Sequence, residues 1–166
     1  FGASGYGRSR AEAAYYTHFN DKYSGISTWH KSLAKEALAT GKITNVSGRQ
    51  YAFPDVQRRA RGKVSHFTMI KNYPVQGLAT ADIVPVVVME LEERLRLLQS
   101  CLVNTVHDSA VVDVHPKEIN YVLQIIDDLN KDLDNIIHEA YGIEMCVPML
   151  LEAKIGNNWL DTVDVV

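Results

Sequence analysis

The sequence predicts a mixed α+β fold in which an antiparallel sheet is covered on one face by helices. Two observations indicate this class. The chain has 166 residues, of which 46% are hydrophobic, so it can bury a core of its own. Along the chain, apolar residues recur at helical or strand spacing in the order helix, helix, hairpin, helix, strand, strand, helix, strand.

The N-terminal part is expected to begin with a helical hairpin. Ser9 and Glu12 have the spacing of a capping box, and apolar residues follow at helical spacing, which predicts a helix over 10–23. The sequence Ser-Gly-Ile at 24–26 should break this helix. A second helix is then expected to end at Gly41, because glycine favours the left-handed backbone of a helix end.

A β-hairpin is expected next. In the stretch 42–53, apolar residues stand on both sides of a Ser-Gly turn at 47–48. A polar, basic stretch at 56–63 follows and is the expected internal boundary. The sequence therefore predicts two parts, 1–64 and 65–166.

The second part is expected to contain two helices and three strands. A long helical region at 65–99 contains Pro85, which should kink the helix or start a new one. The stretch 102–114 is apolar on both sides of a polar centre, which predicts strand, turn and strand. An amphipathic helix should then run from 115 to just before Gly142, and a last strand should cover 145–156.

Bulk properties limit the classes of partner and compartment. The formal net charge of -3 gives no overall basic field, so a nucleic-acid role must depend on local patches. The two cysteines, Cys101 and Cys146, lack metal-type spacing and are expected to be reduced and packed, with a disulfide as the alternative. The longest apolar run, 83–89, is far shorter than the roughly 20 residues that span a bilayer. With no signal peptide at the start, these features favour a cytoplasmic protein without a membrane partner.

At the centre of the predicted strand pair, His107 and Asp108 stand side by side. A polar hairpin turn is the simplest interpretation. The apolar flanks also allow a second one, since a carboxylate at the end of a rigid element is well placed to bind Mg²⁺.

Five segments resemble the family A DNA polymerases, the DNA polymerase I type. TVHDSAVVDV resembles motif C, a strand, a His-Asp turn and a strand. The other similar segments, in the family's order, are FGASGYG at 1–7, GKITNVSGRQYAFPD at 41–55, NYPVQGLATADI at 72–83 and VPMLLEAKIGNNW at 147–159. The resemblance implies a C-terminal fragment with the end of the fingers in 1–64 and most of the palm in 65–166. The segment QGLATADIVP at 76–85 resembles phage-type members of the family more than bacterial repair enzymes.

The resemblance also implies roles for individual residues. Asp108 matches the motif C aspartate, which helps to hold two Mg²⁺ ions for nucleotidyl transfer, and His107 matches the residue near the primer terminus. Asn72 and Gln76 match residues that face the minor groove of the primer-template DNA. Phe1 matches an aromatic residue that contacts the template base and the incoming deoxynucleoside triphosphate region.

A basic group could contact DNA phosphates, and a solvated surface loop explains its charges nearly as well. Its members are Arg49, Arg58, Arg59, Arg61, Lys63 and Lys71.

The sequence departs from the family pattern at several points. Ser109 stands where an acid usually follows the motif C aspartate, and Thr68 replaces a family arginine. The family's motif A aspartate has no counterpart in this sequence. We therefore expect the parent enzyme to take part in DNA replication and this chain alone to be inactive, with exposed surface that could drive self-association.

Two other functions stay open. A metal-dependent phosphohydrolase of the HD type would use His107 and Asp108 with ligands among His18, His30, His66 and Asp113, although such ligands normally lie on helices. A non-catalytic nucleic-acid-binding prophage remnant would explain Ser109 and Thr68 by relaxed function.

Overall fold

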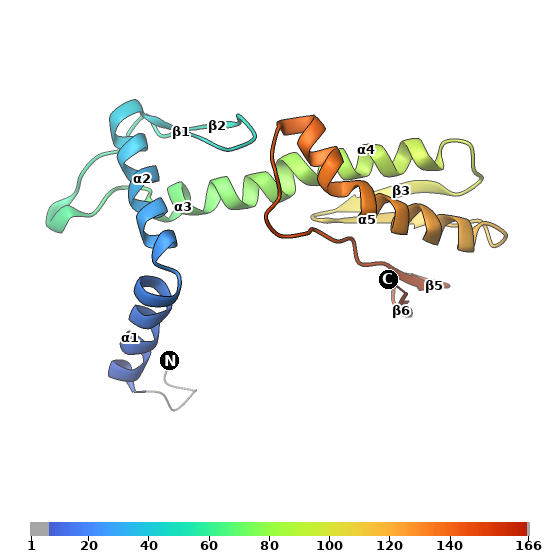
Figure 1. The fold of residues 1–166 in the computed structure, drawn as a ribbon, viewed down its shortest axis with the longest axis horizontal. Coiled ribbons are helices and arrows are strands. Elements are labelled where there is room, and N and C mark those ends of the chain that lie inside the picture. The colour runs from blue at the N-terminus through green and yellow to red at the C-terminus, as the bar shows by residue number, and fades with distance from the viewer. Residues whose placement is uncertain (1–6, 166) are drawn as a thin grey trace. The chain divides into compact units, whose positions relative to one another are not determined.

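The structure, a computed structural model, describes residues 7–165 and confirms the mixed α+β class (Figure 1). The chain divides into two compact units, each with its own core. The first comprises the chain up to Thr44 together with Arg49–Pro74. The second comprises Asn45–Gly48 and the chain from Val75 onward. The assignment of 1–64 to fingers and 65–166 to palm stays a prediction.

Helices form the N-terminal part of the first unit. Helix α1 (Arg8–Tyr16) continues into a π-helical segment, η2 (Thr17–Lys22), and α2 (Ser24–Thr40) follows. As predicted, α2 ends at Gly41, whose φ of 71° is left-handed and whose N–H donates to the carbonyl of Ala37 at 2.8 Å.

Three expectations about these helices are wrong. No capping box forms, because Ser9 already lies inside α1 and Glu12 accepts a hydrogen bond from Arg8 Nε at 2.8 Å. The break falls at Tyr23, with φ of −125° and ψ of 49°, and the following Ser-Gly-Ile is helical. In Figure 1, α2 continues onward from α1 and does not fold back along it, so the two do not form the expected hairpin.

The predicted β-hairpin is confirmed. Strands β1 (Lys42–Thr44) and β2 (Gln50–Ala52) pair antiparallel, with Ile43 opposite Tyr51. Ile43 is fully buried and lies in the core of the first unit. That core joins α2, the hairpin and α3 through Leu33, Ala37, Ile43, Phe53 and Ile70.

The long helical region forms three successive segments. Helix α3 (Phe67–Gln76) leads into a π-helical segment, η4 (Gly77–Ile83), and then into α4 (Val84–Leu95). Pro85 lies in the first turn of α4, where its missing N–H is tolerated. A new helical segment therefore starts next to Pro85, as the sequence predicts, and the wider π-helical turns precede it.

This helix, Phe67–Leu95, has 29 residues and is long and apolar enough to cross a membrane by length and composition. That is weak evidence by itself, because the core helix of a globular domain passes the same test. The helix contains a buried carboxylate, Asp82, and α4 packs against another helix of the second unit. These contacts place one face of α4 in the core of the second unit.

The core of the second unit lies between α4 and α5 (Ile119–Tyr141). Helix α5 begins at Ile119, after a turn in which Glu118 N–H donates to the carbonyl of His115, so its start is later than predicted. It ends at Gly142 as predicted. The buried residues are spaced three or four apart: Ile83 at the end of η4 with Val87, Leu91 and Leu95 of α4 on one side, and Val122, Ile125, Leu129, Leu133 and Ile137 of α5 on the other.

The described strands form three separate two-stranded sheets. The β1–β2 hairpin was expected to stand apart, but the other four strands form two sheets where a single sheet was expected. Strands β3 (Cys101–Val106) and β4 (Ser109–Asp113) pair antiparallel, as do β5 (Lys154–Gly156) and β6 (Thr162–Asp164). The predicted strand over 145–156 is thus limited to its last three residues.

A side-chain amide explains why that strand starts late. Asn130 Nδ2 donates to the carbonyl of Leu151 at 3.1 Å, and Leu151 N–H donates to Asn130 Oδ1 at 2.6 Å. Backbone groups that a neighbouring strand could pair are therefore satisfied by α5. Cys101 and Cys146 are free, as expected, but both are exposed, so the expectation that they are packed is wrong.

We predict that Leu129→Ala destabilises the second unit by about 2–5 kcal/mol, because Leu129 is 0% exposed and its removal leaves a cavity between α4 and α5. Leu97→Ala is the control, since Leu97 is 88% exposed and its loss should change stability by less than about 0.5 kcal/mol. Urea unfolding followed by far-UV circular dichroism measures both. Equal effects of the two substitutions would contradict this assignment of the core.

Candidate functional site

The β3–β4 hairpin places His107 and Asp108 in a two-residue turn, as the sequence predicts. Val106 pairs with Ser109, so these two residues form the whole connection between the strands. The φ of His107 is 56°, a left-handed conformation that few residues other than glycine adopt. Ser109 Oγ donates to the carbonyl of Val106 at 2.8 Å and closes the turn. The Asp108 carboxylate is exposed at the tip of the hairpin.

The base of the hairpin rests on the core of the second unit. Leu102, Val112 and Val114 are half-buried and pack against it. The register shifts between Leu102 and Asn104, which leaves Val103 as the extra residue of a bulge, 56% exposed. The apolar flanks are therefore supported on one side only, and no residue of either strand is fully buried.

A cluster of hydrogen bonds at Glu118 closes the base of the hairpin. The Glu118 carboxylate accepts from Gln99 N–H at 3.1 Å, Ser100 N–H at 2.9 Å and Ser100 Oγ at 2.6 Å. Ser100 Oγ in turn accepts from His115 N–H at 3.0 Å. Residues just before β3 and just after β4 are thereby tied together. The Ser100 hydroxyl is the largest of the effects that lower the pKa of Glu118.

Sequence reasoning missed this cluster. An acid directly before a helix was a usable signal, because carboxylates favour helix N-termini. Its partner Ser100 lies 18 residues earlier, and nothing in the local pattern connects the two.

A second missed residue is Asp82, the one Asp or Glu that is fully buried between residues 7 and 165. Ser47 Oγ donates to Asp82 Oδ2 at 2.6 Å, and Tyr141 Oη donates to the carbonyl of Asp82 at 2.8 Å. The carboxylate holds the turn at 45–48 against η4. Its contacts therefore indicate a structural role.

The residues present do not by themselves fit a two-metal site. Mg²⁺ is normally bound through one or two carboxylates together with substrate oxygens, and a pair of ions needs ligands shared between them. Asp108 supplies one carboxylate, and the neutral Ser109 hydroxyl donates its hydrogen bond to the carbonyl of Val106. Within residues 7–165, no three His, Cys, Asp or Glu side chains gather as metal ligands.

Asn72 and Gln76 lie one turn apart on α3 and both are exposed. Thr68 lies one turn earlier, so the three polar side chains follow one face of the helix. None of them makes a side-chain hydrogen bond within the described part of the chain. Their amide donors are available to a ligand. Phe1, the predicted template contact, lies outside the described residues.

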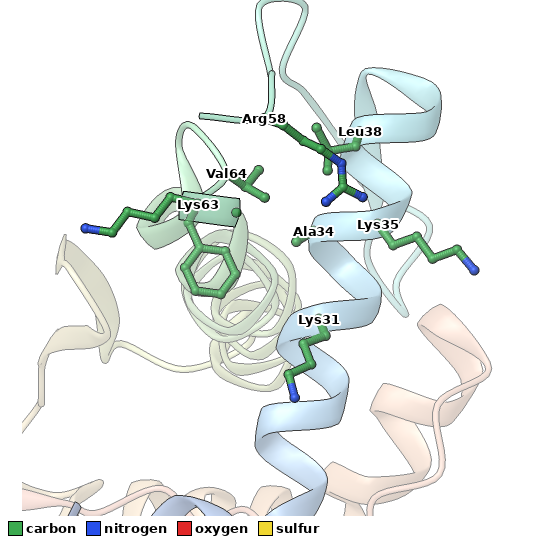
Figure 2. Close-up of a pocket in the computed structure, with 9 residues that line it drawn as sticks. Lys31, Ala34, Lys35, Leu38, Arg58, Lys63 and Val64 are labelled. Carbon is green, nitrogen blue, oxygen red and sulfur yellow. The ribbon is translucent and has the colours of Figure 1, made fainter. Parts of the chain in front are cut away.

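Of the predicted phosphate contacts, Lys71 is half-buried, and the exposed ones are Arg49, Arg58, Arg59 and Lys63. The Arg61 side chain lies outside the described part of the structure. Arg58 and Lys63 line a pocket of about 580 Å³ in the first unit (Figure 2). Lys31 and Lys35 of α2 line the same pocket and were not predicted. Their signal was available, because both stand on one face of a predicted helix.

The ligands of an HD-type phosphohydrolase are not brought together. His18 contacts the rings of Phe19 and Tyr23, and His66 Nε2 lies 3.1 Å from Asp55 Oδ2. His30 contacts the ring of Phe67. His107 and Asp108 lie between strands, whereas that class needs ligands on helices, and Asp113 lies at the other end of β4.

Comparison with known proteins identifies one family. The family model described as DNA polymerase family A matches residues 3–161. DNA polymerase I of Lactococcus lactis subsp. cremoris (strain MG1363) is 30% identical over 162 residues, which cover 93% of this chain and 17% of that protein. DNA polymerase I of Caldicellulosiruptor bescii is 26% identical over 174 residues, with 98% of this chain and 19% of that protein covered. The chain therefore spans less than a fifth of either relative.

Among solved structures, the POL domain of Pol1 from M. smegmatis, in complex with DNA primer-template and dNTP, is similar with a TM-score of 0.60. The match covers 72% of this chain and 21% of that one at 22% identity, so it concerns the fold alone.

We predict that Glu118→Gln reduces the acid sensitivity of the second unit. Because the folded pKa of Glu118 is lowered, its ionised form stabilises the fold above the ordinary glutamate pKa of about 4.3. This stabilisation is lost as the pH falls through the folded pKa. The urea midpoint of the unaltered chain should therefore fall more between about pH 7 and pH 3 than that of Glu118→Gln.

Glu144→Gln is the control for this comparison, since Glu144 is exposed and accepts no side-chain hydrogen bond within the described residues. It should keep the pH dependence of the unaltered chain. An unchanged pH dependence in Glu118→Gln would show that the cluster at Glu118 does not stabilise the fold.

Proposed function

Because this chain belongs to the family A DNA polymerases, we propose that it is part of the polymerase domain of a longer enzyme that extends a primer on a DNA template. Residues 1–64 are the end of its fingers and 65–166 most of its palm. The observation that supports this most is the β3–β4 hairpin, which presents Asp108 at the tip of an element braced by the core and by Glu118. A fixed carboxylate is what metal-dependent nucleotidyl transfer requires.

In this proposal Asp108 supplies one ligand to Mg²⁺, and further acids come from parts of the enzyme outside this chain. His107 lies next to Asp108 at the same tip, where it can contact the end of the primer. The local geometry supports this pairing of roles, because the turn exposes both side chains.

Binding of primer-template DNA is assigned to other exposed side chains. Asn72 and Gln76 donate to acceptors in the minor groove, which are similar in all base pairs, so they contact the duplex without reading sequence. Positive side chains contact phosphates and release counterions: Arg49, Arg58, Arg59 and Lys63. Phe1 contacts the template base.

Two finer points of the proposal concern origin. A prophage remnant that binds nucleic acid without catalysis is the second candidate, favoured by Ser109 and Thr68 in place of an acid and an arginine. The relatives named above are bacterial, so the phage-type origin stays a prediction. The proposal includes DNA replication as the process and keeps the cytoplasm, expected from the sequence, as the compartment.

The purified 166-residue chain is predicted to be inactive. Its candidate metal site has one carboxylate, Asp108, whereas two-metal chemistry needs more than one. A primer-extension assay with Mg²⁺ and all four deoxynucleoside triphosphates tests this. The full-length enzyme is the positive control. Template-directed extension by the chain alone would refute the prediction.

In the full-length enzyme, Asp108→Ala is predicted to lower the extension rate by about 10³-fold or more, because a metal ligand is lost. Affinity for primer-template DNA should stay within about twofold, as the groove and phosphate contacts remain. Asp113→Ala is the matched control on the same hairpin and should keep activity, since Asp113 pairs with Cys101 away from the tip. Normal turnover in Asp108→Ala would remove Asp108 from the site, and an inactive unaltered enzyme would favour the remnant.

A further inference from the structure

The pocket of the first unit combines a positive rim with an apolar floor. Helix α2 contributes Lys31 and Lys35 to the rim, and the loop before α3 contributes Arg58 and Lys63. Figure 2 shows Arg58 reaching across toward α2, whereas the ammonium groups of Lys35 and Lys63 point outward from the rim. The floor is formed by apolar side chains of the same two segments: Ala34, Leu38, Val64 and Phe67.

The loop that forms one wall of the pocket is held by backbone hydrogen bonds. Arg58 and Val64 form an antiparallel bridge, and Arg59 N–H donates to the carbonyl of Lys63 at 2.7 Å. Gly62 has a φ of 72°, which lets the chain reverse between them. The two cations of this wall therefore start from fixed backbone positions.

Charge in the pocket has one sign. No acidic residue lines it, and none of its four cations forms an ion pair within residues 7–165. A fifth cation, Lys71, lies with its Nζ 4.7 Å from the centre of the Phe67 ring. Four unpaired positive side chains around one opening attract an anion.

An aromatic ring is available beside these charges. Phe67 is 38% exposed although it lines the pocket, so one part of its ring is open to a ligand. A nucleotide base can stack on such a ring while its phosphates meet the cations. Duplex DNA keeps its bases inside the stack, so the combination favours a single strand. The pocket volume of about 580 Å³ lies in the usual range of binding sites for small organic ligands, which includes a single nucleotide.

We propose that this pocket binds a single-stranded DNA segment, with phosphates on Lys31, Lys35, Arg58 and Lys63 and a base against Phe67. The choice of DNA rests on the proposed polymerase function. The site deepens that function by giving the unpaired part of a template a place on the first unit.

Fluorescence anisotropy of the full 166-residue chain tests the pocket. The probes are a labelled oligothymidylate of about 12 nucleotides and an abasic deoxyribose-phosphate oligomer of the same length. Affinity is measured at several NaCl concentrations, because each phosphate contact contributes about 0.7 to the slope of log K against log salt for a single strand.

Lys35→Gln and Arg58→Gln should each weaken binding of both probes about 3- to 10-fold and lower the salt slope by about 0.7. Phe67→Leu should weaken oligothymidylate binding about fivefold or more and leave the abasic probe unchanged, because only the bases stack. Lys117→Gln is the charge-matched control, since Lys117 is exposed and lies outside the pocket, and it should leave both probes unchanged.

The proposal is overturned if the chain binds neither probe, if the three pocket variants bind as the unaltered chain does, or if Lys117→Gln weakens binding equally. Urea midpoints of the variants check that the fold is kept. Primer extension by the full-length enzyme separates this proposal from the polymerase function. If the full-length enzyme extends primers but the pocket variants bind single strands as the unaltered chain does, the pocket proposal alone is rejected. If the full-length enzyme is inactive but the pocket variants bind single strands more weakly, the polymerase function alone is rejected.

Discussion

The apolar contact between α4 and α5 holds the second unit together, and the candidate site depends on it. Leu91, Leu95, Leu129 and Leu133 are nearly or fully buried where the two helices meet. The β3–β4 hairpin places only half-buried residues against this core, so its strands have little core of their own. Arg94 and Asp132 add an ion pair at 2.7 Å, but both are partly exposed and such pairs contribute little. Packing of the two helices is therefore what supports the hairpin.

The hydrogen-bond cluster at Glu118 fixes the orientation of the β3–β4 hairpin on this core. A two-stranded hairpin is marginal by itself, and only one face of this one is covered. Glu118 and Ser100 hold together the ends of β3 and β4 that lie opposite the turn, so the two strands cannot easily separate there. The left-handed φ of His107 then sets the shape of the tip.

The sequence predicted those features of the fold that depend on neighbouring residues alone, such as helix ends and turns. The ends of α2 and α5 at Gly41 and Gly142 were predictable because left-handed helix ends favour glycine. The turn at His107 and Asp108 was predictable because apolar strands flank two polar residues. The family resemblance gave roles to Asn72 and Gln76, which the structure places on the exposed side of α3.

Contacts between residues distant in sequence were not predictable. Asn130 takes the backbone groups of Leu151, which removes most of a strand that composition favours. Ser47 and Asp82 meet across 35 positions. The pocket cations come from two segments, and nothing in the local pattern shows that Lys31 and Lys35 lie beside Arg58 and Lys63.

The three separate sheets have a consequence for handling the chain. Each described sheet has two strands, so β3 and β4 each present an outer edge with backbone groups that no neighbouring strand pairs. Neither strand contains a lysine or proline, the residues that usually block strand addition. Such an edge is where a strand of another chain can add, so we expect the self-association predicted from the sequence to take this route. The bulge at Val103 twists one edge and makes the edge of β4 the better template.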